Sequence, residues 1–254
     1  MDVNRRQVLA TSAAALAGGL AGCGAQGSAE SETGEDTETD AATATGDGGP
    51  TAANSIGVEA AVAAEWNAMR ARLWDAYALG VGGDPSSGAA VAQSVFARFE
   101  QSSGEYGAHE MLESTDEAAY EEFEEALGEL RTEGLGAGNV ERAREEAVIA
   151  DEQLASAQRA LVGETLANAL DAQLFGAAAA DAGMLAAGGD IEGATTAAED
   201  VLTRFEDAPA HGALESADGE SYEAFEGSLE TAGGASDAGT VSEAATAAME
   251  AALA

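Results

Sequence analysis

A repeated pattern of residues constrains this chain more than any other feature. The segment Gly82-Gly83-Asp84 recurs as Gly188-Gly189-Asp190, and Phe99 recurs as Phe205 at the same separation. Self-similarity of this kind is typical of one structural unit used twice. The sequence therefore predicts an internal duplication, with halves at 57–162 and 163–254. After a four-residue deletion, further matching pairs are His109/His211, Leu112/Leu214, Glu113/Glu215, Ser114/Ser216, Asp116/Asp218, Tyr120/Tyr222, Phe123/Phe225 and Glu124/Glu226.

Apolar residues within each half follow helical spacing. They recur three or four positions apart, and no useful stretch alternates with the period of two that marks a strand. We therefore expect an all-α protein made of two tandem four-helix up-down bundles. The first stripe, on a helix near 57–80, consists of Val62, Trp66, Met69, Leu73 and Tyr77.

Helix-capping residues mark where the later helices begin. Asp84-Pro85 combines an N-cap with proline at the first helical position. Ser114 and Glu117 have the spacing of a capping box, and Asn139 follows a glycine-rich turn as the next N-cap. In the second half we expect helices near 165–187, 191–206, 217–232 and 240–253.

The charge of the chain restricts its partners and its surroundings. The 254 residues include 47 acidic and 10 basic side chains, a formal net charge of −37, and every basic side chain is an arginine. Such a charge repels phosphate backbones, so we expect no nucleic acid partner. A hydrophobic fraction of 46% argues against a wholly disordered chain. Because molar salt screens crowded carboxylates, the composition indicates a salt-adapted archaeon with an acidic proteome.

The first residues resemble a twin-arginine (Tat) export signal that ends in a lipobox. Arg5 and Arg6 precede a short apolar stretch, which ends at Leu20-Ala21-Gly22-Cys23. This resemblance implies a signal peptide over 1–22 and a lipid on the Cys23 sulfur, which would anchor the protein outside the cytoplasm. The acidic, glycine-rich stretch from Cys23 to residue 56 then predicts a disordered linker.

Both histidines occupy the same place in the repeat. Each begins the pattern His-x-x-x-Glu-Ser-x-Asp, so on a helix His109 would face Glu113, and His211 would face Glu215. An imidazole beside a carboxylate is half of a site for a transition metal. Further ligands would come from other helices, and Glu110, Glu100 or Tyr120 are the nearest candidates, although the counterpart of Glu110 is Gly212.

A purely structural interpretation of the same residues stays open. The serines could cap helices, the aromatic residues could fill a core, and the glutamates could favour a helix N-terminus. Complete catalytic motifs are missing, including a nucleophile elbow and a His-Glu-x-x-His helix. We therefore expect no enzyme.

The first half contains the segments Glu65–Ala76, Val95–Glu100 and Tyr106–Glu113. These three segments resemble a haloarchaeal family of unknown function. That resemblance implies helical repeats, sometimes joined to halocyanin-type blue-copper domains, and no defined activity. Gly107-Ala108-His109 is also similar to the first half of the Gly-x-His-x-x-Glu marker of imelysin-like and iron-uptake proteins, although Leu112 stands where that marker has Glu.

Two hypotheses about function follow. The first is a lipid-anchored, non-enzymatic helical protein on the extracytoplasmic face of the membrane, acting as an interaction module for a surface redox or transport protein. The alternative is a protein that binds iron or copper through the paired His/Glu motif, in metal uptake or surface electron transfer.

Overall fold

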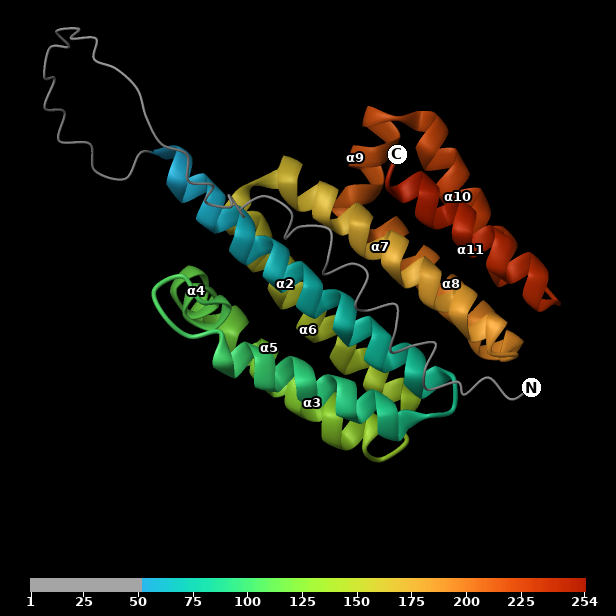
Figure 1. Ribbon diagram of the computed structural model, residues 1–254, viewed down its shortest axis with the longest axis horizontal. Coiled ribbons are helices and arrows are strands. Elements are labelled where there is room, and N and C mark those ends of the chain that lie inside the picture. Colours follow the sequence, from blue (N-terminus) through green and yellow to red (C-terminus); the bar gives the residue numbers. More distant parts are fainter. Residues whose placement is uncertain (1–51) are drawn as a thin grey trace, which may run out of the picture.

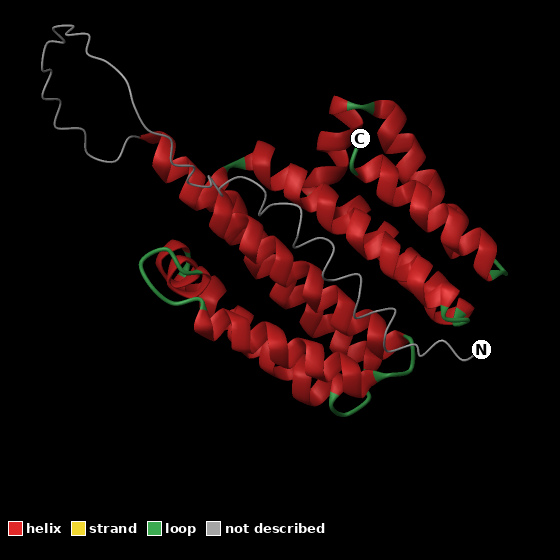
Figure 2. Ribbon diagram, viewed as in Figure 1, coloured by secondary structure: helices red, strands yellow, loops and turns green. Residues whose placement is uncertain are grey.

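The computed structural model describes the backbone of residues 52–254, and side chains from Gly57 onward. This part of the chain is helical throughout and contains no strand (Figure 2), as the sequence predicts. None of its helices is both long and apolar enough to cross a membrane. The predicted signal peptide and linker, with Arg5, Arg6 and Cys23, lie outside the described residues apart from the linker's last few positions.

The two halves pass through the same order of α-helices, and the first half has an additional π-helix (Figure 1). The first half consists of α2 (Ala52–Val81), α3 (Pro85–Gln101), α4 (Ala108–Thr115), α5 (Glu117–Glu129), the π-helix η1 (Leu130–Leu135) and α6 (Val140–Val162). The second half consists of α7 (Glu164–Ala187), α8 (Ile191–Asp207), α9 (Pro209–Ala217), α10 (Gly219–Gly233) and α11 (Ala238–Ala252). Each half thus has four long α-helices, as expected, and a short additional helix, α4 or α9, before the third of them. The duplication remains an inference from the sequence.

The predicted N-caps Asp84 and Asn139 are confirmed, whereas the predicted serine caps are wrong. Asp84 accepts a hydrogen bond from the Ser87 amide, and Asn139 accepts one from Arg142. Ser114 caps nothing, because it lies in the last turn of α4 and its hydroxyl donates to the Met111 carbonyl. Asp116 is the N-cap of α5 instead, and Asp218 caps α10 in the same way. Each aspartate has extended backbone angles and accepts from a backbone amide, which is what an N-cap requires.

The halves are joined more closely than two bundles in tandem. Helices α2 and α7 pack against each other, with α3, α5 and α6 on the side of α2, and α8, α10 and α11 on the side of α7 (Figure 1). Leu174 of α7 belongs to the apolar core of the first half. Ala78 of α2 belongs to a core cluster of the second half. The central helices therefore bury apolar surface towards both halves, as expected for helices with neighbours on several sides.

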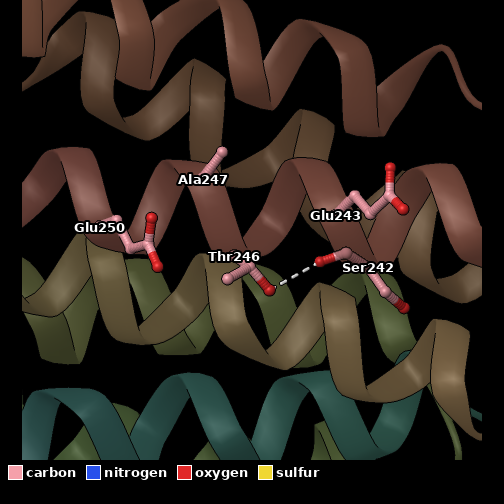
Figure 3. A pocket seen from close by; sticks show the side chains of 5 residues that line it. All are labelled: Ser242, Glu243, Thr246, Ala247 and Glu250. Carbon is pink, nitrogen blue, oxygen red and sulfur yellow. Dashed lines mark hydrogen bonds between the residues drawn. The ribbon is translucent and has the colours of Figure 1, made fainter.

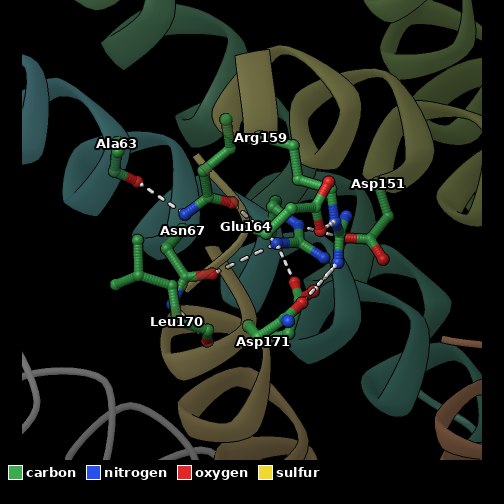
Figure 4. A network of polar contacts seen from close by, with 10 residues as sticks. Ala63, Asn67, Asp151, Arg159, Glu164, Leu170 and Asp171 are labelled. Carbon is green, nitrogen blue, oxygen red and sulfur yellow. Dashed lines mark hydrogen bonds and ion pairs between the residues drawn. The ribbon is translucent and has the colours of Figure 1, made fainter. Parts of the chain in front are cut away.

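A buried ionic network ties α2, α6 and α7 together (Figure 4). The Arg70 guanidinium, only 3% exposed, donates to Asp151 and to Asp171 at 2.6 Å each, and to Gln158 at 2.8 Å. Arg159 also pairs with Asp171. Two arginines thus pair with two aspartates, so each charge that folding buries has a partner of opposite sign.

Two aspartates meet where α2 packs on α7. Asp75 and Asp181 are separated by the same number of positions as the repeated segments, and their carboxyl groups share a hydrogen bond. Burial raises the pKa of both groups, and for Asp181 the neighbouring Asp75 raises it further. Two carboxylates in contact cannot both ionise cheaply, so this contact between the halves favours protonation of one of them.

Candidate metal centre

The short helix α4 positions His109 between α3 and α5. The Trp66 indole donates to the Ala108 carbonyl at 3.0 Å, which fixes the start of α4 on α2. The imidazole then lies against the buried Phe99 ring, with centroids 5.1 Å apart, and meets Tyr120 edge-on at 5.1 Å. Packing on these two rings directs the imidazole towards the end of α3 and the start of α5.

Several ligand atoms converge at this point. His109 Nε2 lies 3.2 Å from the Tyr120 hydroxyl and 3.9 Å from Glu100 Oε1. One ligand atom each from Glu100, His109 and Glu124 lies within 4.8 Å of the other two. Because metal–ligand bonds are about 2.0–2.2 Å long, ligand atoms of one ion lie closer together than this, so the three side chains would have to draw together around a bound ion. Glu100 is exposed, which opens the cluster to solvent.

The electrostatics of the cluster favour a cation. Burial raises the pKa of Tyr120 to about 12, and the hydrogen bond and charge of Glu124 contribute to the same shift. Burial also raises the pKa of the Glu124 carboxyl; the neighbouring Tyr120 opposes this shift, and the adjacent Glu100 adds to it. Both shifts show that further negative charge is disfavoured here. A metal ion among the two carboxylates would relieve that repulsion.

The second half contains the same aromatic frame with a looser arrangement of carboxylates, in which Glu226 and Glu206 also act on Tyr222. His211 Nε2 lies 3.0 Å from the Tyr222 hydroxyl, and the ring packs on Phe205 at 5.2 Å. Glu206 and Glu226 stand at the positions that match Glu100 and Glu124. Within residues 57–254, however, the first-half cluster is the group of three whose ligand atoms come within metal-binding range.

The predicted partners of the histidines, Glu113 and Glu215, are exposed and do not belong to the group of converging ligand atoms. The segment around His109 is helical, as the metal hypothesis required, but Glu113 is exposed and is not a member of the cluster. Glu215 is exposed in the same way. Glu100 and Tyr120, considered in the sequence as further ligands, do approach His109. Whether the motif binds a metal stays a prediction, now with a different set of ligands.

Glu124 is a member of the cluster that the histidine motif did not predict as a ligand. Its signal was present, because Glu124 recurs as Glu226, and it lies four positions after Tyr120 on one helix face. Sequence spacing placed it on α5, and only the fold places α5 beside His109.

A hollow on the outer surface of α11 lacks a comparable set of ligands. It is a shallow hollow whose lining residues all come from this helix (Figure 3). Thr246 donates its hydroxyl proton to the Ser242 carbonyl within the helix at 2.8 Å. The Ser242 hydroxyl donates to the Gly183 carbonyl at 3.4 Å. These hydroxyls are engaged with backbone, so we place the candidate site at His109.

Comparisons with known proteins identify the family and nothing about its chemistry. The family model described as a domain of unknown function, DUF5059, matches residues 61–254 and so includes both halves. No curated protein matches the chain, and no solved structure does. The chain therefore belongs to the DUF5059 family of domains of unknown function.

Proposed function

We propose that this protein is a non-enzymatic, membrane-anchored binding protein, and that its helical part binds a transition-metal ion. The observation that carries the proposal is the approach of Glu100, His109 and Glu124 around one point, from three different helices. The His109 imidazole is held in place by the rings of Phe99 and Tyr120, unlike the carboxylates spread over the acidic surface. The sequence repeat supports the same residues, since all three have counterparts in the second half.

The donor set indicates which metals suit the site. Two carboxylates and one imidazole, with the Tyr120 hydroxyl beside them, are ligands for iron, manganese or zinc rather than for Cu(I), which prefers sulfur. Three protein ligands leave room for water or a partner's ligand, and Glu100 faces solvent. An open site of this kind suits capture and release, as in metal uptake, or contact with a surface redox protein.

Metal titration of the mature chain tests the proposal. We expect one Zn²⁺, Mn²⁺ or Fe²⁺ per chain by calorimetry in molar KCl, which screens diffuse binding to the acidic surface. His109→Ala should weaken binding at least about 100-fold, because it removes the imidazole and leaves every carboxylate in place. His211→Ala is the matched control and should retain the site.

Two results would contradict metal binding. Wild-type protein without a stoichiometric metal would exclude the site and leave an interaction module as the function of the anchored helical body. Equal binding by His109→Ala and wild type would assign the metal to the acidic surface instead.

The membrane anchor is a separate part of the proposal. It is supported by the order of Arg5-Arg6, the apolar stretch and Cys23 in the sequence. We expect Cys23→Ser to be released from the membrane fraction, and replacement of both arginines by lysine to keep the precursor inside the cell. A Cys23→Ser variant that fractionates with membranes like wild type would contradict lipidation at this residue.

A further inference from the structure

The second ring nitrogen of His109 faces a carboxylate that the metal cluster does not use. His109 Nδ1 lies 3.9 Å from Glu110 Oε2. Both atoms are buried, and neither has a hydrogen-bond partner within the described part of the chain. Leaving two buried polar atoms unpaired is costly, and a small side-chain movement would pair them. We propose that Glu110 is the positioning residue that makes His109 a metal ligand, an inference that rests on the proposed metal site.

The chemistry of a neutral imidazole gives Glu110 this role. Such a ring carries one N–H and one lone pair, and a hydrogen bond at one nitrogen decides which is which. An Nδ1–H that donates to Glu110 leaves the Nε2 lone pair directed towards Glu100 and Tyr120. Carboxylates in this outer position orient ligating histidines and raise their basicity, and their removal typically lowers metal affinity about 10–100-fold.

The second half shows what the site looks like without this residue. The position after His211 is Gly212, so α9 has no acidic side chain in its first turn, whereas α4 has Glu110 there. The hydroxyl and ring contacts of the two histidines are otherwise alike. Glu110 thus distinguishes the half in which ligand atoms converge from the half in which they do not.

Glu113 provides a control for charge alone. It lies on the same short helix as Glu110 and carries the same charge, but its side chain is exposed and is outside the metal cluster. If Glu110 acted only by adding negative potential near the metal, removal of Glu113 would have a comparable effect. If Glu110 acts by orienting the imidazole, Glu113 is dispensable.

The experiment compares Glu110→Ala, Glu110→Gln and Glu113→Ala in the full mature chain. Zn²⁺ affinity is measured by calorimetry in molar KCl, and circular dichroism without metal verifies the fold. We expect Glu110→Ala to weaken binding about 10–100-fold. Glu110→Gln should recover part of the loss, because its amide oxygen still accepts from Nδ1–H. Glu113→Ala should stay within about two-fold of wild type.

Nitrogen NMR of the metal-free protein provides a readout that a merely structural role would not move. We expect the His109 signals of wild type to show the Nδ1–H tautomer, and those of Glu110→Ala to shift towards Nε2–H. Unchanged affinity and an unchanged tautomer in Glu110→Ala would overturn the inference. So would an equal loss of affinity in Glu113→Ala. Absence of metal from wild type would instead contradict the proposed function.

Discussion

The two histidine clusters have nearly the same packing and different polar surroundings. The phenylalanine–histidine centroid distance is 5.1 Å in the first half and 5.2 Å in the second, and both His–Tyr distances are 5.1 Å. The paired phenylalanines beneath them lie 4.9 Å and 4.7 Å apart. Within the described residues, ligand atoms of three such side chains lie within 4.8 Å of one another only in the first cluster, although Glu226 and Glu206 also act on Tyr222 in the second. The aromatic frame therefore positions a histidine, and the polar residues around it determine what that histidine can bind.

The strongest test of the shared frame is removal of the phenylalanine under each imidazole. Phe99 is 0% exposed and Phe205 is 1% exposed. We expect Phe99→Ala and Phe205→Ala each to lower the free energy of unfolding by about 3–5 kcal/mol, the range found for large-to-small core substitutions. Because the halves share core residues, each variant should unfold in one cooperative transition when followed by circular dichroism in denaturant.

Phe96 is the control for this pair. It lies on the same helix as Phe99 and is only partly buried, so Phe96→Ala should cost clearly less. A difference of more than about 2 kcal/mol between Phe99→Ala and Phe205→Ala would show that the two frames are not energetically equivalent.

The sequence was sufficient to predict most long helices, because their apolar stripes and caps are local signals. Asp84 and Asn139 begin their helices as expected. The capping box failed because α4 spans only eight residues, too few for a periodic pattern to define, so Ser114 was assigned to the wrong helix. The packing of α2 on α7 depends on contacts between distant segments, which helical periodicity does not encode.

The candidate site was predicted in part for the same reason. Spacing along one helix selected Glu113 as the partner of His109, but the ring turns towards α3 and α5, where Phe99 and Tyr120 hold it. Tertiary packing thus overrides the four-residue rule. The repeated pairs Glu100/Glu206 and Glu124/Glu226 were the better signal. Glu100 and Glu124 lie beside His109, and Glu206 and Glu226 occupy the matching positions around His211 in the repeat.

A gain of function in the second half would sharpen the comparison further. Gly212 is helical, and a Cβ built there meets nothing within 4 Å, so a larger side chain fits. In a His109→Ala background, Gly212→Glu should strengthen metal binding at His211 about ten-fold, because it supplies the carboxylate that Glu110 supplies in the first half. Calorimetry with Zn²⁺ in molar KCl measures the change.

Gly57→Glu in the same background adds the same charge at another open, exposed helical position. It should leave the affinity unchanged. If the two glutamates had equal effects, or if neither had any, the difference between the halves would not lie in the residue that follows each histidine.

The smallest expected effect concerns Asp75 and Asp181, the equivalent positions at which the two halves touch. Because burial and Asp75 raise the pKa of Asp181 above its usual 3.8, the folded state holds this proton more tightly than the unfolded state. Its stabilisation is complete in acid and is lost as pH rises through the raised pKa. Asp181→Asn cannot ionise and still donates to Asp75, so at neutral pH it should be more stable by about 1 kcal/mol, with a flatter stability–pH curve.

Asp75→Asn is the mirror-image variant and should gain less than Asp181→Asn. Its side chain also pairs with Arg72 at 3.4 Å, and that ion pair is lost with the carboxylate. Thermal denaturation of both variants from pH 4 to pH 8 separates the two contributions. Lower stability of Asp181→Asn with an unchanged pH profile would mean that both carboxylates are ionised at the contact. The two halves would then meet through arginine-neutralised charges rather than through a shared proton.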